Sequence, residues 1–245
     1  MKKVILILIG LVLTFVLSGC DFMPWQLEDE ATMQTNLMDA RSTGREGTVG
    51  IQVRLSNDSI TPSGEVNSYG SAVVFFKGET YYYILTNFHV IDRQDYDHAK
   101  YTIHTKTGEE TNAELVYSDK AYDLAMLRFE INDLALGAIN IDARLNRSLS
   151  RGEMLLAIGY PSEVPGVVTY GEYIGMSRTD KVAFDVLTHS ALIFPGNSGG
   201  PLIDLNGNLV GVNTWTSTEY EERYLAIPLK NIHDFIDDSG RFTRD

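Results

Sequence analysis

The feature that most constrains how this chain can fold is a succession of short strand-like runs that starts at residue 47. In the first run, residues 48–55, apolar side chains alternate with small or polar ones, the pattern of a half-buried strand. Later runs are rich in β-branched and aromatic residues and are separated by turn residues, with Asn206-Gly207 the strongest hairpin signal. Such a chain must close or stack its strands to bury them, so we expect an all-β fold. The expected strands are 48–55, 69–76, 81–85, 101–105, 113–117, 124–129, 154–158, 167–176, 182–187, 201–205, 209–213 and 224–227.

These runs form two groups of six, joined by a less regular segment at residues 130–151. Each group is sufficient for one small antiparallel β-barrel, so the sequence predicts two six-stranded barrels. Only residues 230–238 have a helical pattern, with Ile232 and Phe235 on one face, which predicts a short C-terminal helix. In residue numbers, the expected first barrel covers about 47–135, the second about 150–228, the whole domain 47–237 and the tail 238–245.

The first twenty residues differ from the rest. Lys2 and Lys3 precede an apolar run over residues 4–17, which is short for a membrane span but suits a signal peptide. The run ends in Leu17-Ser18-Gly19-Cys20, which resembles the lipobox of bacterial lipoproteins. That resemblance implies that residues 1–19 are removed and that Cys20 is acylated and anchors the protein to a membrane. Residues 20–46 lack a sustained period and are expected to form a tether, although 28–41 is compatible with a short helix.

Composition excludes several classes of partner. The net charge of −13 and the absence of a basic stripe argue against nucleic acid. Cys20 is the only cysteine, which excludes an internal disulfide and a thiolate metal site. No paired-histidine motif occurs either, so we expect neither a metal nor another cofactor.

The run Gly196-Asn197-Ser198-Gly199-Gly200-Pro201 is poorly suited to a strand or a helix. One serine among glycines is the arrangement of a nucleophile held beside backbone amides that can receive an oxyanion. Taken alone, a serine between glycines is more often a plain glycine-rich hairpin, although the longer run that includes Pro201 is more selective. The choice between these two interpretations depends on a histidine and a carboxylate elsewhere in the chain.

His89 and Asp123 are the best partners for Ser198. His89 follows the end of an expected strand, where an imidazole can be held by packing and still reach solvent, as a general base requires. Asp123 begins the apolar strand 124–129, where a carboxylate needs a partner such as a histidine N–H. The alternatives are weaker, because Asp119 lies in a turn and Asp92 is too close to His89 along the chain. His98, His104 and His233 are interpreted as ordinary surface or core residues.

The chain order His89, Asp123, Ser198 is that of the chymotrypsin type. The blocks at residues 86–90, 123–127 and 196–202 resemble the three signature blocks of trypsin-like serine proteases, and they are most similar to the bacterial HtrA/Deg group. The resemblance implies two perpendicular barrels with the active site between them. It also implies a His89–Asp123–Ser198 triad and an oxyanion hole formed by the amides of Gly196 and Ser198.

The same resemblance implies polypeptide substrates, a place in the bacterial cell envelope and a trimer as one assembly state. With Cys20 acylated, the expected location is the outer face of the cytoplasmic membrane. Many HtrA members carry a PDZ domain after the protease domain, and we expect none within this sequence.

Two departures from the family pattern affect activation and specificity. Digestive-type members have an aspartate before the serine that pairs with a new N-terminal amine, whereas Asn197 is neutral, so we expect that no cleavage at Thr48 is needed. The run before Pro195 differs from the D-A-A-I-N common in HtrA proteins, where these residues help to shape the primary specificity pocket. Apolar residues near this pocket favour small or apolar substrate side chains. His189 leaves open an acidic substrate residue instead. The expected specificity residues are Leu192, Ile193, Asn213 and Trp215.

The leading hypothesis from the sequence is therefore a membrane-anchored serine endopeptidase. The rival is a catalytically silent binding or scaffold protein on the same fold, which reaction with an active-site serine probe would distinguish.

Overall fold

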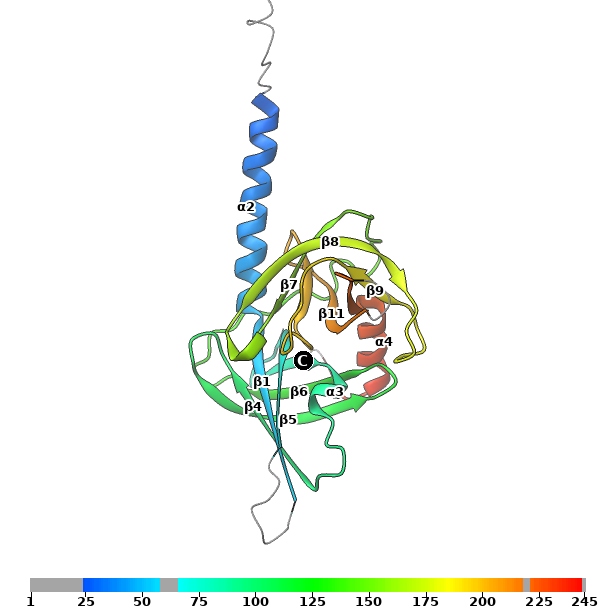
Figure 1. Ribbon diagram of the computed structural model, residues 1–245. Helices are drawn as coiled ribbons and strands as arrows, with labels where there is room; N and C mark the ends of the chain where they lie inside the picture. Colours follow the sequence, from blue (N-terminus) through cyan, green and yellow to red (C-terminus); the bar gives the residue numbers. More distant parts are fainter. Residues whose placement is uncertain (1–23, 58–65, 218–220, 244–245) are drawn as a thin grey trace, which may run out of the picture. The chain divides into compact units, whose positions relative to one another are not determined.

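The computed structural model describes residues 24–57, 66–217 and 221–243 (Figure 1). The chain divides into two compact units, residues 1–36 and Leu37–Asp245. The second unit contains two closed six-stranded antiparallel barrels, so the predicted fold class is confirmed. Cys20 and the expected signal peptide lie outside the described residues. Within the described ranges, no helix has both the length and the apolar character needed to cross a membrane.

Helix α2 extends from Pro24 to Glu46, so most of the expected tether is helical and the helix is longer than the compatible segment 28–41. Its 23 residues correspond to about 35 Å at the usual rise per residue. Within the second unit, its last turns pack into the core. Ala40 is buried, and Gly44 lies against Ile158 and Ile203 of the second barrel. The folded unit that carries the barrels therefore begins before residue 47.

The first barrel has the strand order β1-β2-β3-β6-β5-β4. Its core is built from alternate residues of these strands, with Val49, Ile51, Val53 and Ile84 fully or almost fully buried. The alternation seen in the sequence is thus the inward-outward alternation of the barrel wall. The strands are β1 Thr48–Ser56, β2 Val66–Lys77, β3 Tyr81–Thr86, β4 His98–His104, β5 Glu110–Asp119 and β6 Leu124–Glu130.

The second barrel has the order β10-β11-β12-β9-β8-β7. The expected hairpin at Asn206-Gly207 joins β10 to β11, with Gly207 at positive φ and Asp204 accepting the Asn206 and Asn208 N–H groups. Strand β9 is shorter than expected and begins at Val186. The strands are β7 Met154–Gly159, β8 Val167–Ser177, β9 Val186–His189, β10 Pro201–Asp204, β11 Leu209–Thr216 and β12 Tyr224–Pro228.

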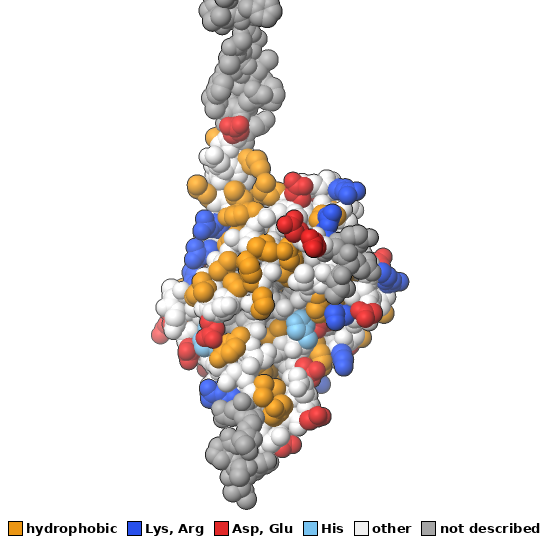
Figure 2. Space-filling model, in the orientation of Figure 1, with side chains coloured by type: hydrophobic (Ala, Val, Ile, Leu, Met, Phe, Trp, Pro, Cys, Tyr) orange, Lys and Arg blue, Asp and Glu red, His pale blue; other side chains and the backbone are white. Residues whose placement is uncertain are grey.

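One hydrophobic cluster extends across both barrels and includes Leu85 and Met126 of the first and Leu156 and Val212 of the second. Helix α4, Leu229–Ser239, adds to it and packs against β11, β12 and β5. The Phe235 ring contacts Tyr117 of the first barrel at a centroid distance of 5.1 Å. The barrels are therefore held in one arrangement by a shared core. Figure 2 shows apolar side chains gathered on one face over the second barrel.

Candidate active site

His89 lies on a four-residue helix that the sequence did not predict. Strand β3 ends at Thr86, and helix α3, Phe88–Ile91, follows after Asn87. Val90 and Ile91 are buried in the first-barrel core, and the His89 side chain remains 40% exposed. The helix thus anchors the backbone through its apolar side and leaves the imidazole accessible.

Asp123 is buried and is fully engaged in hydrogen bonds. It has a left-handed backbone, with φ of 51°, in the turn before β6, a conformation that aspartate tolerates better than most residues. Its Oδ2 lies 2.9 Å from His89 Nδ1, and its Oδ1 accepts the His89 backbone N–H at 3.0 Å. Thr214 Oγ1 donates to Oδ2 at 2.8 Å. This carboxylate therefore fixes the tautomer with the proton on Nδ1 and leaves Nε2 of His89 as the basic atom.

Ser198 lies between a tight turn that contains Gly196 and a second glycine, Gly199, and the local backbone depends on both glycines. The Asn197 N–H donates to the Phe194 carbonyl at 2.9 Å, with Pro195 second and Gly196 third in the turn, as in a type II turn. Gly196 has φ of +100°, and a β-carbon there would lie 2.7 Å from the Tyr160 carbonyl oxygen. Gly199 has φ of +86°, and its β-carbon would lie 2.1 Å from the Ser71 carbonyl oxygen. No other residue type fits these two positions.

The Ser198 hydroxyl donates to the Thr214 carbonyl oxygen at 2.9 Å. Thr214 thus contacts Ser198 through its backbone and Asp123 through its side chain, and Asp123 in turn holds His89. Among the described residues, this hydroxyl has no hydrogen bond to His89. The three predicted residues are brought together where the barrels meet, with the serine hydroxyl bonded to β11.

Two backbone N–H groups beside Ser198 are left without a partner in the described part of the chain. The N–H groups of Asn197, Gly199 and Gly200 donate to backbone carbonyls, whereas those of Gly196 and Ser198 do not. These are the two amides that the sequence pattern suggested for an oxyanion.

Ser71 holds the glycine turn in place and was missed by sequence reasoning. Its hydroxyl donates to the Gly196 carbonyl at 2.6 Å and accepts the Tyr160 N–H at 2.9 Å. Its own N–H donates to the Ser198 carbonyl at 2.8 Å. The only signal in the sequence was a small polar residue inside an apolar strand. Thr214 gave no clearer signal.

The four expected specificity residues have different surroundings. Leu192 is 42% exposed and Trp215 half-buried, with its ring 6.3 Å from that of His89. Ile193 is buried, and Asn213 is fully buried with its amide nitrogen donating to the Pro201 carbonyl at 2.9 Å. Leu192 and Trp215 are therefore the accessible members of this set.

His189, the alternative contact for an acidic substrate residue, is completely buried in β9. Burial lowers its pKa to about 3, and the nearby Ala191 backbone opposes this only in part. Neither ring nitrogen has a hydrogen-bond partner of normal geometry within the described residues, and the ring lies 6.1 Å from that of Tyr224. A neutral, enclosed imidazole cannot pair with a substrate carboxylate.

Asn197 is also fully buried. Neither of its side-chain amide atoms has a hydrogen-bond partner in the described residues, and the side chain lies against Gly159. The residue fills the position before the nucleophile without forming an ion pair.

The family profile for "Trypsin-like peptidase domain" matches residues 70–212, which is more than half of the chain. The chain therefore belongs to the trypsin-like peptidases, and its relatives are HtrA/DegP-like serine proteases. It is 35% identical over 178 residues to the Serine protease Do-like HtrB of Bacillus subtilis (68% of this chain, 37% of the relative). It is 29% identical over 222 residues to the Do-like HtrA of the same organism (83% and 48%).

Solved structures agree with this assignment. The serine endoprotease from Yersinia pestis superposes with a TM-score of 0.64 at 31% identity, covering 84% of this chain and 68% of that chain. The chain spans less than half the length of the two Bacillus relatives.

Proposed function

We propose that this chain is a serine endopeptidase in which Ser198 is the nucleophile, His89 the general base and Asp123 the residue that orients His89. The observation that carries the proposal is the pairing of the buried Asp123 carboxylate with both His89 and Thr214, whose carbonyl holds Ser198. A buried carboxylate aimed at one nitrogen of an exposed imidazole is the arrangement that general base catalysis requires.

The reaction begins when Ser198 Oγ leaves the Thr214 carbonyl and turns toward His89. His89 Nε2 takes the hydroxyl proton as Oγ bonds to the peptide carbonyl carbon. The resulting oxyanion is received by the N–H groups of Gly196 and Ser198, each typically worth about 3–4 kcal/mol. His89 then gives its proton to the leaving amine, the C–N bond breaks and an ester on Ser198 remains. Water, activated by the same imidazole, hydrolyses that ester.

The substrates we propose are exported or envelope proteins. Relatives named as probable periplasmic serine endoproteases support this class and an extracytoplasmic site of action. The apolar side chains of Leu192 and Trp215 favour small or apolar residues next to the cleaved bond. The Leu17–Cys20 sequence supports lipid anchoring at Cys20 on the outer face of the cytoplasmic membrane.

Labelling with a fluorophosphonate probe tests the proposed function. We expect the wild-type chain and a Ser68→Ala control to be labelled, and Ser198→Ala to show no labelling. His89→Ala should label at least a hundredfold more slowly, because the base that activates the hydroxyl is lost. Absence of labelling both with and without added unfolded protein would contradict the proposal and favour the silent scaffold.

The lipid anchor is tested separately. Cys20→Ser should release the protein from washed membranes into the soluble fraction, whereas the neighbouring Ser18→Ala control should stay membrane-bound. Retention of the Cys20→Ser protein on membranes would contradict acylation at this residue.

A further inference from the structure

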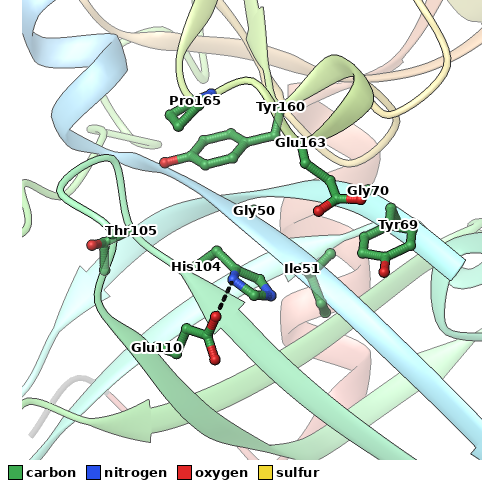
Figure 3. Close-up of a pocket in the computed structure, with 11 residues that line it drawn as sticks. Gly50, Ile51, Tyr69, Gly70, His104, Thr105, Glu110, Tyr160, Glu163 and Pro165 are labelled. Carbon is green, nitrogen blue, oxygen red and sulfur yellow. Dashed lines mark ion pairs between the residues drawn. The ribbon is translucent and has the colours of Figure 1, made fainter. Parts of the chain in front are cut away.

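A cavity of about 200 Å³ lies between the first barrel and the segment that follows β7 (Figure 3). Tyr160, Glu163 and Pro165 lie on one side of it, in the segment that includes the short 3₁₀ helix η1 (Pro161–Glu163). His104 and Glu110 lie on the opposite side, where β4 turns into β5. The cavity is too small for a drug-sized ligand, and a single side chain suits it better.

Two residues that line the cavity also contact the loop that carries Ser198. Gly70 lines it, and a β-carbon on Gly70 would lie 3.1 Å from the Ser198 carbonyl oxygen. Tyr160 also lines it, and its carbonyl lies against Gly196. The cavity and the loop that carries Ser198 are therefore adjacent.

The cavity lies on a different side of the site from the expected specificity residues. Asn213 and Trp215 belong to β11 of the second barrel, and Trp215 flanks the ring of His89. Gly70 belongs to β2 of the first barrel and packs against Val90. If the acyl side of a substrate lies along β11, the residues after the cleaved bond are directed toward the cavity.

The lining carries negative charge together with aromatic and apolar surface. Glu163 and Glu110 contribute carboxylates, and no lysine or arginine is among the described residues that line the cavity. Glu110 is 3.4 Å from His104 Nδ1, whereas the Glu163 carboxylate has no hydrogen bond or ion pair to the described residues. Tyr69 and Tyr160 offer ring surface on which a cation and its aliphatic stem can pack.

The backbone that presents Glu163 is unusual. Ser162 and Glu163 have φ of 50° and 64°, both in the left-handed region that residues with a β-carbon avoid. Hydrogen bonds from the Glu163 N–H to the Tyr160 carbonyl and from the Val164 N–H to the Pro161 carbonyl hold this turn. Such conformations cluster at ligand sites because the strain aims a side chain.

We propose that this cavity binds a basic side chain, arginine or lysine, of the polypeptide substrate on the leaving-group side of the cleaved bond. Glu163 supplies the main charge, and the aromatic walls hold the stem. An organic cation fits better than a metal ion, because the described residues contain no group of three or more acidic, histidine or cysteine side chains arranged to hold a metal. The proposal rests on the proposed protease activity and adds a substrate preference to it.

The test uses quenched fluorescent peptides with one arginine at each of the first four positions after the cleaved bond, each paired with a citrulline peptide. Citrulline has nearly the same shape without the charge. We expect one position at which arginine raises kcat/KM by about threefold to tenfold, the range of a partly exposed charge contact. In Glu163→Gln that ratio should fall toward one, whereas in the exposed Glu79→Gln control it should not change. Equal kcat/KM for all four pairs, or a ratio unchanged in Glu163→Gln, would overturn the proposal.

A second measurement separates this proposal from the protease activity itself. Fluorescence anisotropy with Ser198→Ala protein reports binding of the same arginine and citrulline peptides without turnover. We expect the arginine peptide to bind at least threefold more tightly, and Glu163→Gln to remove the difference. Equal binding of the two peptides would overturn the cavity proposal even if the probe labels Ser198. Loss of labelling with the arginine preference intact would instead overturn the protease mechanism.

Discussion

The hydroxyl of Ser198 donates a hydrogen bond to the backbone carbonyl of Thr214, 2.9 Å away. A nucleophile held in this way is not yet oriented toward its base, and breaking one such bond costs about 1 kcal/mol. Rotation about a single side-chain bond is fast, so this contact lowers the reactive population without blocking the reaction.

The first prediction concerns the direction of that rotation. In a crystal structure of the fluorophosphonate adduct, we expect Oγ to have left the Thr214 carbonyl and the phosphonyl oxygen to lie between the N–H groups of Gly196 and Ser198. An adduct oxygen that points away from both amides would contradict the proposed oxyanion site.

A second prediction concerns the side chain of Thr214. Thr214→Val removes the 2.8 Å hydrogen bond to Asp123. A bond to a charged group is typically worth about 1.5–3 kcal/mol, so kcat should fall by roughly 10- to 100-fold with KM little changed. The pH profile of kcat/KM should also shift, because Asp123 orients His89. Thr102→Val on β4 serves as a control of the same chemistry away from the site, and an unchanged kcat in Thr214→Val would contradict the role.

Ser71 is expected to act by positioning the oxyanion turn. Ser71→Ala removes the hydrogen bond to the Gly196 carbonyl and leaves both that carbonyl and the Tyr160 N–H without their partner. We expect a loss of stability of about 1–3 kcal/mol, measured by urea unfolding. We also expect fluorophosphonate labelling of the folded protein to slow by about tenfold. Labelling at the wild-type rate in a folded Ser71→Ala protein would show that the turn keeps its shape without this residue.

The buried His189 makes stability depend on pH. Its pKa is lowered to about 3 in the folded chain, so below its unfolded value of 6.5 only the unfolded chain binds the proton. Its contribution is therefore complete above about pH 6.5 and is lost as pH falls toward 3. Lowering the pH from 7 to 5 should reduce the free energy of unfolding by about 2 kcal/mol through this single residue.

Urea unfolding of His189→Leu at the two pH values measures this effect. Between pH 7 and pH 5, the free energy of unfolding of the variant should fall by about 2 kcal/mol less than that of the wild type. A His233→Leu control addresses a half-buried histidine on α4, whose Nε2 lies 2.8 Å from the Ile141 carbonyl. Equal pH dependence of the wild type and His189→Leu would mean that His189 is protonated in the folded chain.

Asn197→Asp should be poorly tolerated. The residue is fully buried, and none of its side-chain polar atoms has a partner in the described residues, so a carboxylate there would lose its hydration without gaining a counter-ion. We expect the free energy of unfolding to fall by about 2–4 kcal/mol at pH 7. The loss should shrink as pH falls toward 4, because the carboxyl group then protonates in both states. The exposed Asn206→Asp is the matched control, and equal stability of the two variants would contradict the argument.

The sequence predicted the barrels because their strands alternate with a period of two, as in residues 48–55, and because turns separate them. It also predicted three site residues, because His89 follows an expected strand, Asp123 begins one and Ser198 lies in a glycine-rich run. Helix α2 was predicted only in part, because its apolar residues follow no helical period.

The supporting residues could not be predicted in the same way. Ser71 and Gly196 are 125 positions apart, and only the docking of two barrels brings them together. Thr214 is one polar residue in the β11 run, and its contact with Asp123 depends on the same docking. Short-range patterns carry no information about such pairs, which is why the cavity beside Gly70 was also missed.

The junction between α2 and β1 has a mechanical consequence. The helix ends at Glu46 and the strand begins at Thr48, so a pulling force that undocks the last turns of the helix then passes through Gly47 into β1. Strand β1 is hydrogen-bonded to β2 on one side and to β4 on the other. Tension along the strand therefore shears two ladders at once, and many hydrogen bonds must break together before the strand is extracted. A molecule tethered through its N-terminal segment would thus bear load at one of the best-secured strands of its first barrel.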